Sequence, residues 1–164
     1  MVRTEISLFL KNAPGELGKL TARFADAGVN IDAITIQDAS SYVKELFRAR
    51  GKSLKRIASA ASYNSMSKDS ADFALIRILP ADGTINQAID LLSQHDYVFD
   101  MMPVVALELD NRPGELARIA NQLGREGINI NYVYGSVAPS DGKCLLVFSP
   151  EDMEQATKIF KPSC

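Results

Sequence analysis

The sequence has few of the side chains that most metal and acid–base sites require. It contains one histidine, His95, two cysteines and no tryptophan. One histidine with two separated cysteines, Cys144 and Cys164, cannot assemble a typical zinc site, and two cysteines do not form a disulfide framework. The chain has no serine–histidine–acid arrangement and no glycine-rich phosphate loop. We therefore expect a protein that is not an enzyme and that holds no metal or cofactor.

Long apolar runs are also missing. No stretch approaches the ~18 residues that a membrane span needs, and the amino terminus begins an alternating strand pattern rather than a signal peptide. The hydrophobic fraction of 46% and the charged fraction of 23% are those of an ordinary globular protein. We expect a cytoplasmic protein with no membrane partner.

One segment of the chain occurs twice. The residues Asn-Ala-Pro-Gly-Glu-Leu at 12–17 return 99 positions later as Asn-Arg-Pro-Gly-Glu-Leu at 111–116. Each copy continues into a helix-like run and then into Gly-hydrophobe-Asn-Ile, at 28–31 and at 127–130. Such long-period self-similarity indicates one small structural unit built twice. A site made of the repeated residues should occur twice, or once across the join.

Each copy has the pattern strand, helix, strand, strand, helix, strand. In the first copy we expect strands at 6–10, 29–36, 73–79 and 97–101 and helices at 17–27 and 84–94. In the second we expect strands at 104–109, 128–134 and 144–148 and helices at 114–126 and 151–160, with Pro103 joining the copies. This predicts an α+β fold of two ferredoxin-like βαββαβ sandwiches in tandem, residues 1–102 and 103–164. The second sandwich lacks its last strand, and the open sheet edge favours a homodimer.

The first copy is longer than the second. The offset between matching positions falls from 99 to 70, which predicts an insertion of 29 residues within 38–72. Residues 41–68 hold seven lysines and arginines against one acid, Glu45. The insertion could form two short helices that dock an acidic protein, or a solvated cover over a sheet edge, which is the simpler interpretation.

The repeated polar residues are the candidate site. A turn between a strand and a helix presents unpaired backbone N–H groups that can hold a carboxylate. A side-chain amide both donates and accepts hydrogen bonds, so it can hold either end of a free amino acid. The simpler alternative is that Asn12 and Asn111 shape and cap their turns, and that Asn30 and Asn129 ease the chain out of a glycine turn.

With these two motifs present in both copies, the sequence resembles the ACT domain family, small regulatory modules attached to many enzymes of amino-acid metabolism. The resemblance covers most of the chain except 38–72, and the tandem arrangement is similar to stand-alone two-ACT bacterial proteins. It implies a ferredoxin-like sandwich and a non-catalytic regulatory protein. It also implies that a free amino acid or similar metabolite binds at an interface between two ACT domains.

The resemblance also assigns residues. In the serine-sensing ACT domains of phosphoglycerate dehydrogenase, the ligand is contacted by the asparagine before the Pro-Gly turn and by the asparagine that opens the second strand. These positions match Asn12 and Asn30 in the first copy and Asn111 and Asn129 in the second. Because the insertion could cover the site of the first copy, we expect the second copy to carry the site.

Two further pairs of positions belong to the candidate site. Gly15 and Gly114 would let the backbone approach a ligand closely. A histidine found two residues before the turn in the serine sensors is replaced here by Leu10 and Leu109. This replacement implies a more apolar or differently oriented ligand, with Leu109 in contact with its side chain.

Two other functions stay open. A protein-interaction module could use the basic insertion to capture an acidic partner. An RNA-binding protein could use its sheet, because ferredoxin-like sheets that read RNA display aromatic side chains on adjacent strands. Tyr132 and Tyr134 have the alternate spacing for one face, but the basic and aromatic signature is missing. Nucleic acid is therefore the weakest of the three interpretations.

Overall fold

The computed structural model describes residues 1–39, 73–138 and 142–160. Residues 40–72, which include the basic segment 41–68 of the insertion predicted within 38–72, lie outside the described part, as do residues 139–141 and 161–164. The strands are β1 (Val2–Lys11), β2 (Ile31–Asp38), β3 (Phe73–Pro80), β4 (Phe99–Asp110), β5 (Ile130–Ala138) and β6 (Lys143–Pro150). The helices are α1 (Glu16–Asp26), α4 (Ile85–Gln94), α5 (Glu115–Arg125) and α6 (Met153–Ile159). None of these helices is long and apolar enough to cross a membrane.

The six strands form one antiparallel sheet in the order β2-β3-β1-β4-β6-β5. The two copies repeat even an irregularity of this sheet. The pairing register shifts at the start of the second strand of each copy, between Ile31 and Ala33 and between Ile130 and Tyr132. The α+β class and the antiparallel pairing of two similar halves are therefore as the sequence predicts.

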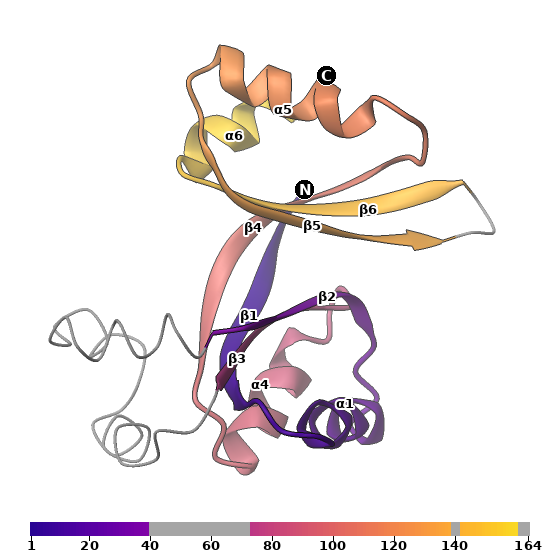
Figure 1. Ribbon diagram of the computed structural model, residues 1–164, viewed down its shortest axis with the longest axis vertical. Helices are drawn as coiled ribbons and strands as arrows, with labels where there is room; N and C mark the ends of the chain where they lie inside the picture. Colours follow the sequence, from indigo (N-terminus) through magenta and orange to yellow (C-terminus); the bar gives the residue numbers. More distant parts are fainter. Residues whose placement is uncertain (40–72, 139–141, 161–164) are drawn as a thin grey trace, which may run out of the picture.

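Helices cover one face of each half (Figure 1). In the first half, Leu20 and Phe24 of α1 and Leu92 of α4 are buried against β1 and β3. In the second half, Ile119 and Leu123 of α5 and Ala156 of α6 are buried against β4 and β6. The apolar residues of α1 and α5 recur at spacings of three and four, so each helix turns one stripe toward the sheet.

Strand β4 belongs to both halves. The sequence predicted two strands joined by Pro103, but the chain runs through this position as a single strand from Phe99 to Asp110. The Ala106 N–H donates to the Met1 carbonyl, so the backbone N–H groups of every second residue of β4, counted from Ala106, point toward β1. Pro103 is three residues away, so its nitrogen points to the other side of the strand. Strand β6 pairs only from Val105 onward. The missing N–H of Pro103 therefore removes no ladder bond. The predicted division between residues 102 and 103 falls inside this strand.

The sheet folds back on itself, so that its two end strands, β2 and β5, contact each other (Figure 1). The helices then lie on the outside of both halves, and the uncovered sheet faces meet in the middle. The apolar residues of this middle layer come from four strands: Ala33, Leu79, Val104, Ala106 and Val147.

Candidate functional site

The two asparagines of the first copy lie at opposite ends of their sheet. Asn12 follows β1, whereas Asn30 comes after α1 and directly before β2. Strand β3 pairs with both strands: its first residue, Phe73, lies beside the end of β1 and its last, Pro80, lies beside the start of β2. At ~3.3 Å per residue, these ends are about 23 Å apart. One copy therefore cannot bring both of its own asparagines onto a single amino acid.

The second copy has the same layout. The Asn111 N–H donates to the Gly142 carbonyl (2.7 Å) at one end of β6, and the Glu151 N–H donates to the Asn129 carbonyl (2.9 Å) at the other. All four asparagine side chains are exposed. Within the described part of the chain, no side-chain hydrogen bond involves Asn12, Asn111 or Asn129. Their amides are therefore not used to cap their own turns with these residues.

The glycines and the leucine of the predicted site have clear structural roles. Gly15 and Gly114 precede α1 and α5 with φ of 86° and 97°, a left-handed conformation that favours glycine. A Cβ at either position would meet nothing within 4 Å, so backbone conformation rather than crowding within the chain requires them. The side chain of Leu109 packs against the core beneath α5 and α6, where it supports the fold.

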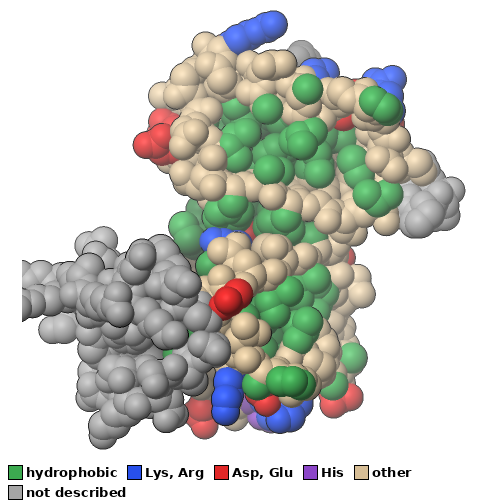
Figure 2. All heavy atoms as spheres, viewed as in Figure 1, with side chains coloured by type: hydrophobic (Ala, Val, Ile, Leu, Met, Phe, Trp, Pro, Cys, Tyr) green, Lys and Arg blue, Asp and Glu red, His purple; other side chains and the backbone are tan. Residues whose placement is uncertain are grey.

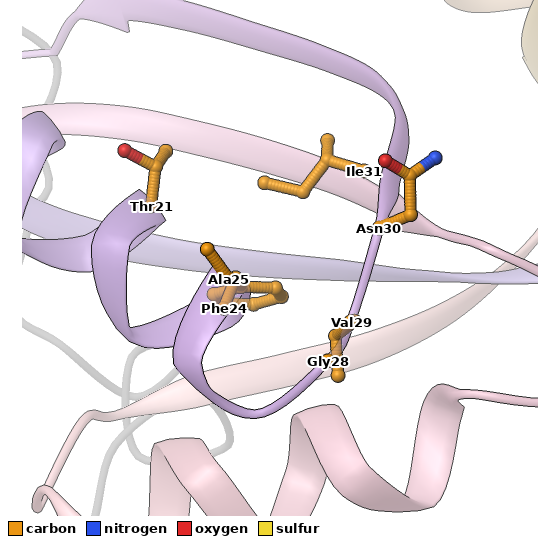
Figure 3. A pocket seen from close by; sticks show the side chains of 7 residues that line it. All are labelled: Thr21, Phe24, Ala25, Gly28, Val29, Asn30 and Ile31. Atoms are coloured by element: carbon orange, nitrogen blue, oxygen red, sulfur yellow. The ribbon is translucent and has the colours of Figure 1, made fainter.

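One predicted residue, Asn30, lines a pocket (Figure 3). The pocket has a volume of about 410 Å³, within the usual range for small-molecule sites, and lies where α1 ends and β2 begins. Phe24 and Val29, which are 1% and 3% exposed, give it an apolar floor. Its lining is Thr21, Phe24, Ala25, Gly28, Val29, Asn30 and Ile31.

The Asn30 side chain is held by a hydrogen bond to Asp32, which is itself bound to Arg3. Its amide nitrogen donates to Oδ1 of Asp32 (3.2 Å), and Nη2 of Arg3 donates to Oδ2 of the same carboxylate (2.8 Å). Nε of Arg3 also pairs with Asp82 (2.9 Å), and the guanidinium donates to the Pro80 carbonyl. The Arg3 side chain is only 11% exposed, so this group is partly shielded from water.

A second pocket, of about 550 Å³, lies in the other half between the end of α5 and the start of α6. Three carboxylates, those of Glu126, Glu151 and Asp152, lie along it, and none of the predicted site residues does. Asp152 already accepts the Gln155 N–H (2.9 Å) as the cap of α6. Because none of the predicted site residues lines it and Asp152 is already used to cap α6, this pocket is the poorer candidate.

A family model described as an ACT domain pair matches residues 50–161. The chain belongs to the ACT domain pair family. Among solved structures, this ACT pair is similar to protein BT0572 from Bacteroides thetaiotaomicron, with 23% identity over 97% of this chain and 86% of that one and a TM-score of 0.68. It is also similar to the ligand-free regulatory subunit of aspartate kinase from Thermus thermophilus, with 14% identity over 97% and 92% of the two chains and a TM-score of 0.52. These likenesses concern the fold alone. No match is found among curated proteins.

Between the two ACT units lies a buried polar cluster that the sequence did not reveal. The carboxylate of Glu5 is 0% exposed and accepts hydrogen bonds from the hydroxyls of Tyr132 (2.6 Å) and Tyr134 (2.7 Å). Nε of Arg77 lies 3.9 Å from the same carboxylate, and its guanidinium lies over the Tyr132 ring, 4.1 Å from the centroid. Ser7 donates a longer bond to it, at 3.3 Å. We call these residues the Glu5 cluster.

The environment of the two tyrosines makes them hard to ionise. Burial, together with the bond to the Glu5 carboxylate, raises the pKa of Tyr132 to about 12. Burial and the neighbouring Glu5 charge raise the pKa of Tyr134 further in the same direction. Because both side chains face the layer between the units, they do not form the open stacking surface that an RNA-binding sheet displays.

Proposed function

We propose that this ACT pair is a non-catalytic regulatory protein that binds a free amino acid or a similar small metabolite. Membership of the family supports a regulatory, small-molecule-binding role. The observation that carries the proposal is the pocket at Asn30, which combines a buried apolar floor with an exposed side-chain amide held in one orientation. An apolar floor and a few fixed polar groups are what small-molecule sites usually offer.

A second copy of the chain completes this site. Strands β1 and β2 are both antiparallel to β3 and so run in the same direction. If two β2 strands pair about a two-fold axis, the start of one lies beside the end of the other. Asn30 of one subunit then lies at the same end of the joined sheet as Asn12 of the partner subunit. This arrangement removes the offset of about 23 Å along the strands, and the separation that remains is across the strands of the joined sheet.

Two observations favour β2 as the pairing edge. It is an end strand of the described sheet, and an end strand is a template for another chain. Its side chains Ile34 and Ile36, two residues apart, are 38% and 46% exposed, so this edge presents apolar surface that a second copy would cover. On the side of the molecule that Figure 2 shows, apolar side chains form one patch on each half.

Thermal melting with each of the twenty amino acids tests the proposal. A binder with a Kd of about 100 μM, added at 10 mM, should stabilise the folded state by about 2.7 kcal/mol and raise the melting temperature by several degrees. N30A should abolish this rise while leaving the melting temperature of the unliganded protein unchanged, since Asn30 is exposed. N129A, at the matching position of the second unit, is the control. No rise with any amino acid would contradict the proposal.

A further inference from the structure

We infer that Asp32 fixes the Asn30 amide with its oxygen toward the pocket, so that the first ACT unit recognises the ammonium group of an amino acid there. The inference rests on the proposed function, because it assigns the polarity of the same pocket. Asp32 and Arg3 are then positioning residues, and Asn30 is the residue that touches the ligand.

The orientation follows from what a carboxylate can do. The two ends of a side-chain amide have almost the same shape, but one donates hydrogen bonds and the other accepts them. Because an ionised carboxylate only accepts, the end of Asn30 that lies 3.2 Å from Asp32 must be the nitrogen. The oxygen must then lie on the other side, and Figure 3 shows it on the side of Ile31, within the pocket lining.

Arg3 keeps Asp32 from turning away. One oxygen of Asp32 accepts from Arg3 at 2.8 Å, which leaves the other oxygen for Asn30. Arg3 is itself held by Asp82 and by the Pro80 carbonyl at the end of β3. The acceptor in the pocket is therefore set before any ligand arrives, and a group fixed in advance loses less entropy on binding.

The charges near the pocket act in the same direction. One guanidinium, that of Arg3, lies between two carboxylates, those of Asp32 and Asp82. The carboxylate of Asp32 is the charged group that contacts Asn30, and it attracts an ammonium and repels a carboxylate. The ligand's carboxylate must therefore be held elsewhere, and unpaired N–H groups at the start of a helix in the partner subunit have the required chemistry.

The second unit has no equivalent of the Asp32–Arg3 pair that orients Asn30. The repeat places Asn131 where the first unit has Asp32, and Met102 where it has Arg3. An asparagine can present either a donor or an acceptor to Asn129, so it cannot enforce one orientation. The described residues make no hydrogen bond to the Asn129 side chain. This difference favours the first unit as the place where the ammonium binds.

The substitution D32N should reverse the polarity. Arg3 only donates, so it will hold the oxygen of the new amide and turn its nitrogen toward Asn30. Two donors cannot face each other, so Asn30 must flip and present its own nitrogen to the pocket. The probes are 3-methylbutylamine and 4-methylpentanoate, which are leucine without its carboxylate and leucine without its ammonium. Titrations followed by the backbone amide signals of Val29 and Ile31 report binding at this pocket.

We expect the natural protein to prefer the amine by about tenfold, the worth of one charge-assisted hydrogen bond. D32N should lose or invert this preference. D82N is the matched control: it removes the same charge beside Arg3 but leaves the bond that Asn30 donates to Asp32, so most of the preference should remain. Equal binding of the two probes, a preference for the acid, binding of neither, or equal effects of D32N and D82N would overturn the inference. If D32N does not fold, the comparison of the probes on the natural protein decides.

The two proposals fail in different ways. If an amino acid stabilises the protein and N30A removes the effect, yet the acid probe binds as well as the amine, the assigned polarity is wrong and the proposed function stands. If none of the twenty amino acids stabilises the protein, both proposals fall.

Discussion

At the scale of single residues, the Glu5 cluster shows how one buried charge is accommodated. A carboxylate that is 0% exposed would destabilise the fold severely if it had no partners. Glu5 has two tyrosine hydroxyls at 2.6 and 2.7 Å and a guanidinium nearby. Since Glu5 and Arg77 lie in the first unit and both tyrosines lie in the second, these bonds form only when the two units are packed together.

Removing one hydroxyl from this cluster should weaken the whole molecule. Y134F deletes a hydrogen bond to a buried charge, and we expect the free energy of unfolding to fall by about 2 kcal/mol. Y97F is the matched control, because Tyr97 accepts a bond from Arg23 at a partly buried site of the first unit and should cost less than about 1 kcal/mol. Urea unfolding of the three proteins measures the difference. If the two variants lost the same free energy of unfolding, the hydrogen bond in the Glu5 cluster would contribute no more to stability than an ordinary one.

At the scale of elements, the helix starts α1 and α5 are determined by glycine rather than by a capping side chain. Neither Gly15 nor Gly114 offers a side-chain cap, and both adopt left-handed φ values of 86° and 97°. The Asn-x-Pro-Gly turn thus sends the chain from a strand into a helix over the same sheet in both units.

The two glycines of α5 should respond to alanine in opposite directions. G114A places a Cβ at a φ of 97°, which should lower the free energy of unfolding by about 1 kcal/mol. G124A lies inside the helix, where an added Cβ meets nothing within 4 Å, so it should raise stability by about 0.5 to 1 kcal/mol. Chemical denaturation of both variants checks the signs. Stabilisation by G114A would contradict this account of the turn.

The sequence predicts most elements because each depends on local signals. Period-two and period-three-to-four patterns locate the strands and helices to within a few residues, and the glycine turns mark where helices begin and end. The union of two predicted strands in β4 was missed, because Pro103 usually breaks a strand and only the pairing partners show that its nitrogen faces an unpaired side. The position of Asn30 was predicted, but the role of Asp32 depends on side-chain geometry.

At the scale of the whole molecule, the contact between the units is asymmetric although their folds repeat. The positions that match Glu5 and Arg77 in the second unit are Val104 and Val147, which lie in the apolar part of the same middle layer. The position that matches Tyr132 in the first unit is Ala33, also in that layer. Comparing the two copies for such departures is the signal that could have located the interface. The sequence alone did not say that these faces meet.

The last prediction concerns the proposed dimer. A lysine at Ile36, which is 46% exposed on β2, would bring two like charges close together in a two-fold pairing of this strand. We expect the natural protein to be a dimer by light scattering, I36K to be a monomer, and the stabilisation by an amino acid to disappear with the dimer. V137K, on the equivalent edge strand β5 at a side chain 54% exposed, is the control and should leave both properties unchanged. A natural protein that is monomeric yet binds an amino acid, or an I36K variant that remains dimeric, would show that the pocket at Asn30 needs no second copy.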